Sequence, residues 1–133
     1  MASDLSTYLG NKVVRWLAAQ AMPSAPASCY IALFNGDPKG AGSEVTTTIR
    51  VAGRVAVGFE TPPASGTDNN ITTSTDSDFG AAAGAATVTH VAIYDAQSAG
   101  NILCSKALAS SVAVTVGETV KVLAGDLTFT VGS

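Results

Sequence analysis

The sequence predicts a mainly β domain, an antiparallel β-sandwich of jelly-roll-like form with one amphipathic α-helix at its N-terminus. Residues 87–95 (TVTHVAIYD) alternate in character and are rich in β-branched side chains, as strands are. Further short strand-like runs follow, separated by Gly-containing turns at Gly117-Glu118 and Gly125-Asp126. Hydrophobic residues make up 47% of the chain but aromatic residues only 6%, which suits a sheet built from small side chains.

The 133 residues are enough for one domain with a core of its own, so we expect a single domain over residues 1–133. Within it we place a helix at residues 4–21 and the sandwich at residues 28–133. High apolar content and a net charge of only −3 argue against disorder.

The N-terminal segment carries the helical pattern. Ser3 is the expected cap, Asp4 suits the positive end of the helix dipole, and Pro23 ends the helix. This helix either docks on the domain's own sheet or packs on a neighbouring subunit. Its apolar stripe has three- and four-residue spacing and consists of Leu5, Tyr8, Leu9, Val13, Trp16 and Leu17.

Strands and loops alternate through the middle of the chain. Residues 28–34 are apolar on both faces, which predicts a central strand, and residues 35–42 (NGDPKGAG) are rich in turn formers. Three consecutive threonines favour a short edge strand at residues 45–49. A strand at residues 54–60 places Val55, Val57 and Phe59 on one face.

The remaining segments are predicted by the same rules. We expect a surface loop at residues 61–70, a polar extended segment at 71–79 and an extended connector at 80–86. Strands then follow in the runs ILCSKALA, VAVTV, TVKVLA and LTFTV.

Reactive residues are few. Cys29 and Cys104 lie in separate apolar runs and are interpreted as buried free thiols, with an inter-strand disulfide as the open alternative. Neither has a second Cys or His at ligand spacing, so we expect no metal site there. His90, the one histidine, is placed on the face of Val88, Ala92 and Tyr94 as a neutral, hydrogen-bonded residue, with Asp95 on the opposite face.

The sequence gives little indication that the protein binds calcium or nucleic acid or spans a membrane. Asp68, Asp76 and Asp78 have part of the spacing of a calcium loop but lack its bidentate Glu, so a solvated loop is preferred. Seven Lys and Arg residues, scattered singly, argue against nucleic-acid binding. No apolar run approaches the roughly 20 residues that a membrane span needs. The first ten residues also lack a basic signal-peptide region. We therefore expect a non-enzymatic protein with no cofactor, no metal and no catalytic residues.

Four blocks of the sequence resemble small structural proteins of tailed bacteriophages. They are the helix LSTYLGNKVVRWL, the strand and loop YIALFNGDP, the block from Gly80 to Leu108 that contains TVTHVAIYDA and GNILCSKAL, and the ending VTVGETVKVLAGDLTFTV. The resemblance covers nearly the whole chain. It implies a β-sandwich protein of the virion, made in the host bacterial cytoplasm, that serves as a tail or tail-fibre component or as a capsid decoration (cement) subunit. The implied partners are other virion proteins and further copies of the chain.

The alternative function is a carbohydrate-binding, lectin-like module, which needs exposed aromatic side chains near Asp and Asn residues. If the chain is a virion part, its contacts should come from the helix stripe and from two long loops, because loops on a rigid β-scaffold carry recognition. The candidate interface residues are Leu5, Tyr8, Leu9, Val13, Trp16, Leu17, Asn35, Gly36, Asp37, Pro38, Pro62, Pro63, Asp68 and Asn69.

Overall fold

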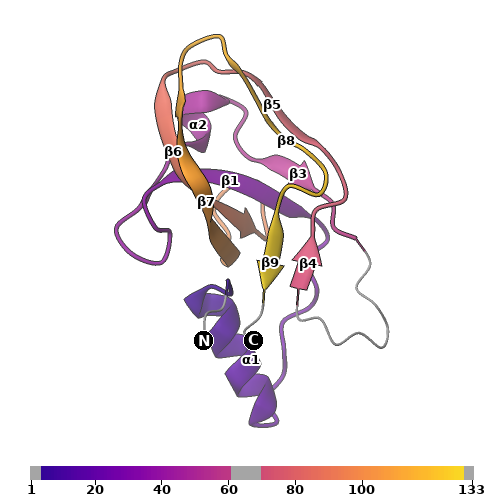
Figure 1. Cartoon of the computed structure of the whole chain (residues 1–133). Helices are drawn as coiled ribbons and strands as arrows, with labels where there is room; N and C mark the ends of the chain where they lie inside the picture. The colour runs from indigo at the N-terminus through magenta and orange to yellow at the C-terminus, as the bar shows by residue number, and fades with distance from the viewer. Residues whose placement is uncertain (1–3, 61–69, 131–133) are drawn as a thin grey trace.

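Three antiparallel sheets form the body of the protein, and one helix lies at its end (Figure 1). The computed structural model describes residues 4–60 and 70–130. The prediction of a mainly β, antiparallel fold with an N-terminal helix is confirmed. In chain order the elements are α1 (Thr7–Leu17), β1 (Cys29–Asn35), β2 (Ser43–Glu44), α2 (Thr46–Ile49), β3 (Val55–Val57), β4 (Asn70–Thr72), β5 (Ser77–Ala81), β6 (Ala86–Tyr94), β7 (Ile102–Val114), β8 (Thr119–Val122) and β9 (Thr128–Thr130).

The largest sheet has the strand order β2-β1-β6-β7, and β3 also pairs with β1. Its central pairing aligns Ile31 of β1 with Ile93 of β6. Four consecutive β1 residues, 31–34, are buried, as expected for a strand that is covered on both faces. The prediction of a central strand here is therefore confirmed. The pairs β4–β9 and β5–β8 form the two smaller sheets.

The segment before α1 joins the largest sheet to the β4–β9 pair. The amide of Asp4 donates to the carbonyl of Thr130 at 2.8 Å, and the amide of Ser105 donates to the carbonyl of Asp4 at 2.8 Å. The amide of Ser6 donates to the carbonyl of Leu103 at 2.9 Å. The chain thus runs between β7 and β9 before the helix begins, which fixes the position of α1 relative to the sheets.

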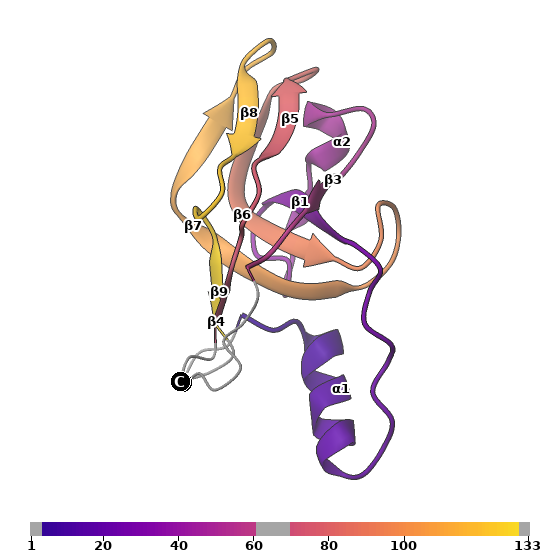
Figure 2. The ribbon, with the colours of Figure 1, turned by 90° about the vertical axis from the view of Figure 1, so that its right-hand side faces the viewer.

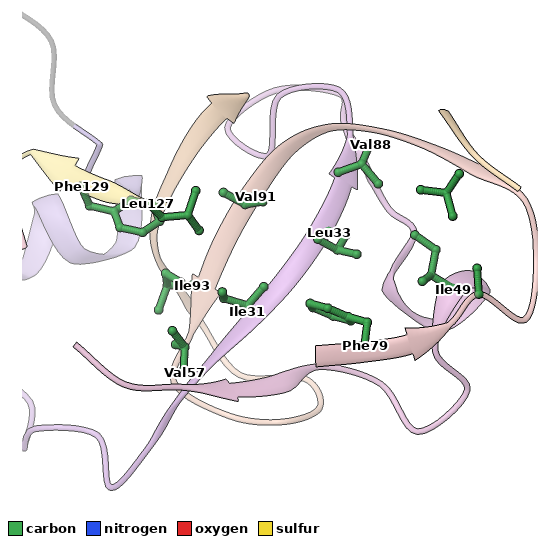
Figure 3. Close-up of a cluster of buried hydrophobic side chains, with 12 residues drawn as sticks. Ile31, Leu33, Ile49, Val57, Phe79, Val88, Val91, Ile93, Leu127 and Phe129 are labelled. Carbon is green, nitrogen blue, oxygen red and sulfur yellow. The ribbon is translucent and has the colours of Figure 1, made fainter. Parts of the chain in front are cut away.

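The main core lies between the largest sheet and the strands that face it (Figure 3). Figure 3 shows Leu127 and Phe129 at one end of this cluster, Ile49 and Phe79 towards the other end, and Ile31, Val91 and Ile93 between them. A second cluster, on the other side of the sheet, consists of Ala32, Phe34, Ala92 and Tyr94. The main core, which lies between the largest sheet and the smaller strand pairs, gives the layered arrangement that the sandwich prediction requires.

The bounds of the predicted helix need correction. The helix begins at Thr7 rather than Asp4, and its cap is Ser6 rather than Ser3, because the Ser6 hydroxyl accepts the Leu9 amide at 3.0 Å. Asp4 is instead held in extended backbone by its bonds to β7 and β9. The helix ends at Leu17, and Ala19 adopts a left-handed conformation before Pro23 is reached.

The predicted edge strand at residues 45–49 is wrong, because this segment forms α2. The Thr46 hydroxyl accepts the Leu33 amide at 2.9 Å, and Thr46 and Ile49 are both fully buried. A helical turn places residues three apart on one face, so it directs both side chains inward, which an extended strand does not do. A tertiary contact with β1 therefore overrides the β preference of the threonines.

Irregular pairing changes two further predictions. The register of β6 against β7 shifts between Val88 and His90, which places Val88 in the main core and Ala92 and Tyr94 in the second cluster. The predicted common face for these three residues is therefore wrong. β7 is one strand of 13 residues, although the sequence suggested two runs. The connector predicted at residues 80–86 is shorter than expected, because β5 ends at Ala81 and β6 begins at Ala86. Residues 82–85 form the connection between these strands.

Candidate protein interface

The C-terminal half of α1 exposes large apolar side chains. Val14 is 64% exposed, Trp16 57% and Leu17 73%. Figures 1 and 2 show why: α1 contacts the β-body near its first turn and then extends past it. The sequence-based option in which Trp16 docks on the domain's own sheet is therefore wrong. Tyr8, Leu9 and Val13, nearer the body, are half-buried.

The surroundings of α1 leave this face open. Every residue from 18 to 28, the segment that leads from α1 to β1, is exposed.

Charge is distributed unevenly along the chain. Between residues 5 and 36 the only charged side chains are Lys12 and Arg15, whereas nine of the ten acidic residues follow Gly36. The helix is thus basic as well as apolar, and the rest of the protein is acidic.

A structured loop adjoins the start of α1. The Gly36 amide donates to Thr89 Oγ1 at 2.7 Å, and the Lys39 amide donates to Asp37 Oδ1 at 2.8 Å. Gly36 has a φ of 95°, and a Cβ atom at Gly42 would collide with the Gly36 carbonyl, so both positions require glycine. Pro38 and Lys39 share a shallow pocket with residues 6–8 of the helix start. The structure thus brings together two of the three predicted contact elements.

The other predicted interface residues divide into two groups. Asn35 and Asp37 are exposed at the start of the loop, and Leu5 is half-buried between the sheets. Pro62, Pro63, Asp68 and Asn69, the third predicted element, lie outside the described residues.

A polar cluster that sequence reasoning missed surrounds Arg54. Its guanidinium donates to both carboxylate oxygens of Glu44, at 2.9 and 3.0 Å, and to the carbonyls of Ala96 and Ala99, at 3.0 and 2.7 Å. It also lies over the Tyr94 ring, 3.4 Å from its centroid. Arg54 is 7% exposed, and its contacts fasten β2 and the loop between β6 and β7 beside the second cluster. No local pattern marks this pairing, because Arg54 and its partners come from three separate segments of the chain, at Glu44, Arg54 and residues 94–99.

The pKa of Glu44 is set by two opposing effects. Burial raises it, but hydrogen bonds from Arg54 and Thr46 together outweigh burial and leave the pKa below its ordinary value. Glu44 is therefore ionised at neutral pH and paired with Arg54. The Arg54 guanidinium and the Glu44 carboxylate are thus both engaged in contacts that hold the fold together.

The side chains of Cys29, Cys104 and His90 lie in surroundings that favour a structural role over a reactive one. Cys29 and Cys104 are free thiols, as expected, and both are partly buried. Burial raises the pKa of Cys104 to about 12, so this sulfur is protonated at neutral pH and is a poor nucleophile. His90 Nδ1 lies 2.9 Å from Thr89 Oγ1, which agrees with the predicted hydrogen-bonded histidine.

The aspartates that suggested a calcium loop serve the turns. Asp76 Oδ1 accepts the Ala124 amide at 2.8 Å, and this bond lowers the pKa of Asp76. Asp78 Oδ1 accepts the Gly80 amide at 2.8 Å, while Asp68 lies outside the described residues. Within residues 4–60 and 70–130, no three His, Cys, Asp or Glu side chains are grouped so that they could hold a metal ion. In the same residues, no helix has the length and apolar character needed to cross a membrane.

The described residues form a β-rich scaffold from which α1 projects with large apolar side chains exposed. Comparison with known families identifies the group. Residues 4–130 match the family model described as Podophage GP4 fiber I protein gp80, and the chain belongs to this family. It is therefore a virion structural protein of the phage tail-fibre type. The search of curated proteins found no match.

Proposed function

We propose that this protein is a non-enzymatic fibre component held in the particle by contacts with a neighbouring virion subunit, and that the C-terminal half of α1 is its main docking element. The observation that carries this proposal is the exposure of Val14, Trp16 and Leu17 on one short helix. Large exposed apolar patches on soluble proteins mark interaction sites, and tryptophan is enriched among the residues that dominate binding energy.

The second contact surface in this proposal is the loop at residues 36–42. Its backbone is held by Thr89 and by the close approach of Gly36 and Gly42, and it lies beside the first turn of α1. A surface that is already ordered loses less conformational entropy on binding than a flexible one. We therefore expect the helix and the loop to contact one continuous partner surface.

A structural role also fits the chemistry of the described residues. The Cys104 thiol is protonated at neutral pH, and Arg54 is fully engaged by Glu44 and two carbonyls. The family favours placement in the fibre over the capsid shell, where a decoration subunit would lie. Membership of the fibre family supports placement in the fibre. The contacts through α1 and the loop at residues 36–42 are what we propose.

Replacing both Trp16 and Leu17 with Ala is expected to separate attachment from folding. Because both side chains are more than half exposed, the free energy of unfolding should change by less than about 1 kcal/mol. The copy number of the chain in purified particles, measured by quantitative mass spectrometry, should fall several-fold.

The matched control is Val51→Ala, since Val51 is 81% exposed but lies away from α1, in the turn between α2 and β3. This variant should incorporate at the normal level. Normal incorporation of the Trp16 and Leu17 double variant would show that α1 is not the docking element.

A further inference from the structure

An apolar groove lies between β7 and β8 and opens onto the main core. Its floor includes the buried side chains of Leu33, Val88 and Val91, and Figure 3 shows these three among the core residues. Val112 of β7 and Val120 of β8 stand on its two walls, and Val112 is 48% exposed. The groove has a volume of about 380 Å³. The core is therefore incompletely covered at this place.

β7 and β8 are connected by the turn at residues 115–118, but these two strands do not pair with each other. β7 is the last strand of the largest sheet, and among the described strands β8 pairs only with β5. The groove thus lies where two sheets approach without hydrogen-bonding. An inserted side chain can reach the apolar floor there without breaking a sheet.

The rim of the groove is acidic. Glu118 and Asp126 line it, and the one basic lining residue, Lys121, is paired with Asp76 at 3.5 Å. These four side chains sum to a net negative charge. The exposed half of α1 has the opposite character, because its apolar residues are accompanied by Lys12 and Arg15. The groove and the helix are therefore complementary in both polarity and charge.

A copy of the chain cannot place its own helix in its own groove in this arrangement. Figures 1 and 2, which share a vertical axis, show β8 towards the upper end of the molecule and α1 at the lower end. Only a second copy can bring the two surfaces together.

We infer that the groove between β7 and β8 receives the exposed face of α1 from a second copy of this chain, with Trp16 as the inserted side chain. The inference rests on the proposed function, in which α1 is the docking element, and names its partner. The groove volume lies in the range of about 300–1,000 Å³ that is typical of binding pockets. Because the two surfaces differ, the contact is head-to-tail and produces either a closed ring or an extending chain of subunits.

The test is sedimentation velocity of the purified full-length protein over a range of concentrations. The wild type should associate as concentration rises. Trp16→Ala, which alters the helix, and Val112→Lys, which alters the groove, should each remain monomeric. The matched control is Val116→Lys, because Val116 is 68% exposed and does not line the groove. It should associate like the wild type.

Mixing the two monomeric variants gives the sharpest result. Trp16→Ala keeps an intact groove and Val112→Lys keeps an intact helix, so the mixture should form a one-to-one dimer that does not grow. If Val112→Lys fails to fold by circular dichroism, Arg15→Glu on the exposed helix replaces it as a charge test, and it should weaken self-association.

Three results would overturn the inference. They are a wild-type protein that stays monomeric up to about 1 mM, a folded Val112→Lys variant that associates normally, and a mixture without heterodimer. Particle incorporation separates the two proposals. If Val112→Lys incorporates normally while the Trp16 variant does not, α1 binds a different virion protein, so the proposed function stands and this inference fails.

Discussion

Replacing Phe129 with Ala is expected to lower the free energy of unfolding by about 3–5 kcal/mol. Phe129 is 2% exposed and lies in the main core, where its ring packs edge-on against Phe59 at a centroid distance of 6.3 Å. Truncation removes the buried ring and leaves a cavity that surrounding strands fill only in part. Urea denaturation followed by circular dichroism measures the change.

The matched control for this prediction is Val116→Ala, whose side chain is 68% exposed. It should alter the free energy of unfolding by less than about 0.5 kcal/mol. A loss below about 1 kcal/mol for Phe129→Ala would mean that β9, the last strand of the described chain, contributes little to the core.

The second large effect is expected at Arg54. Replacing it with Ala leaves the partly buried Glu44 carboxylate and the carbonyls of Ala96 and Ala99 without their donor. Breaking one side of a fully buried ion pair costs about 3–5 kcal/mol. The Glu44 side chain is 27% exposed and water can solvate it in part, so we expect a loss at or below the lower end of that range. Arg54→Lys should recover only part of the loss, because an ammonium group keeps the charge but not the planar fork that binds both carboxylate oxygens. Full stability in Arg54→Ala would show that the cluster is dispensable.

Lowering the pH should show how much the ion pair between Glu44 and Arg54 contributes to the free energy of unfolding. The pKa of Glu44 in the folded protein lies below its ordinary value of 4.5. Its contribution to stability is therefore complete above about pH 4.5 and is lost as the pH falls through the folded pKa. In Arg54→Ala this part of the pH dependence should become smaller, because only the hydrogen bond from Thr46 then still lowers the pKa of Glu44. An unchanged acid profile in that variant would contradict the assigned cause.

Local patterns predicted much of the β structure because their causes are local. Alternation over residues 87–95 located β6, and the glycine turns at 117–118 and 125–126 located the start of β8 and the connection between β8 and β9. The start of α1 and the helical form of residues 46–49 were not predictable in this way. Asp4 pairs with Thr130, and Thr46 bonds to Leu33, so distant segments decide both conformations.

The candidate interface was predictable only in part for the same reason. The apolar stripe of α1 identified the helix, but its periodicity is the same in the half that contacts β7 and in the half that does not. The extent of the β-body decides that Leu9 is half-buried and Leu17 exposed. The groove was not predicted, because it depends on how β7 and β8 approach each other in space.

Electron cryomicroscopy of the intact particle tests the central claim most directly. We expect this chain to lie in the fibre and protein to cover the exposed side chains of Trp16 and Leu17. A particle in which both side chains remain open to solvent in every copy, or in which the chain lies on the capsid shell, would contradict this expectation.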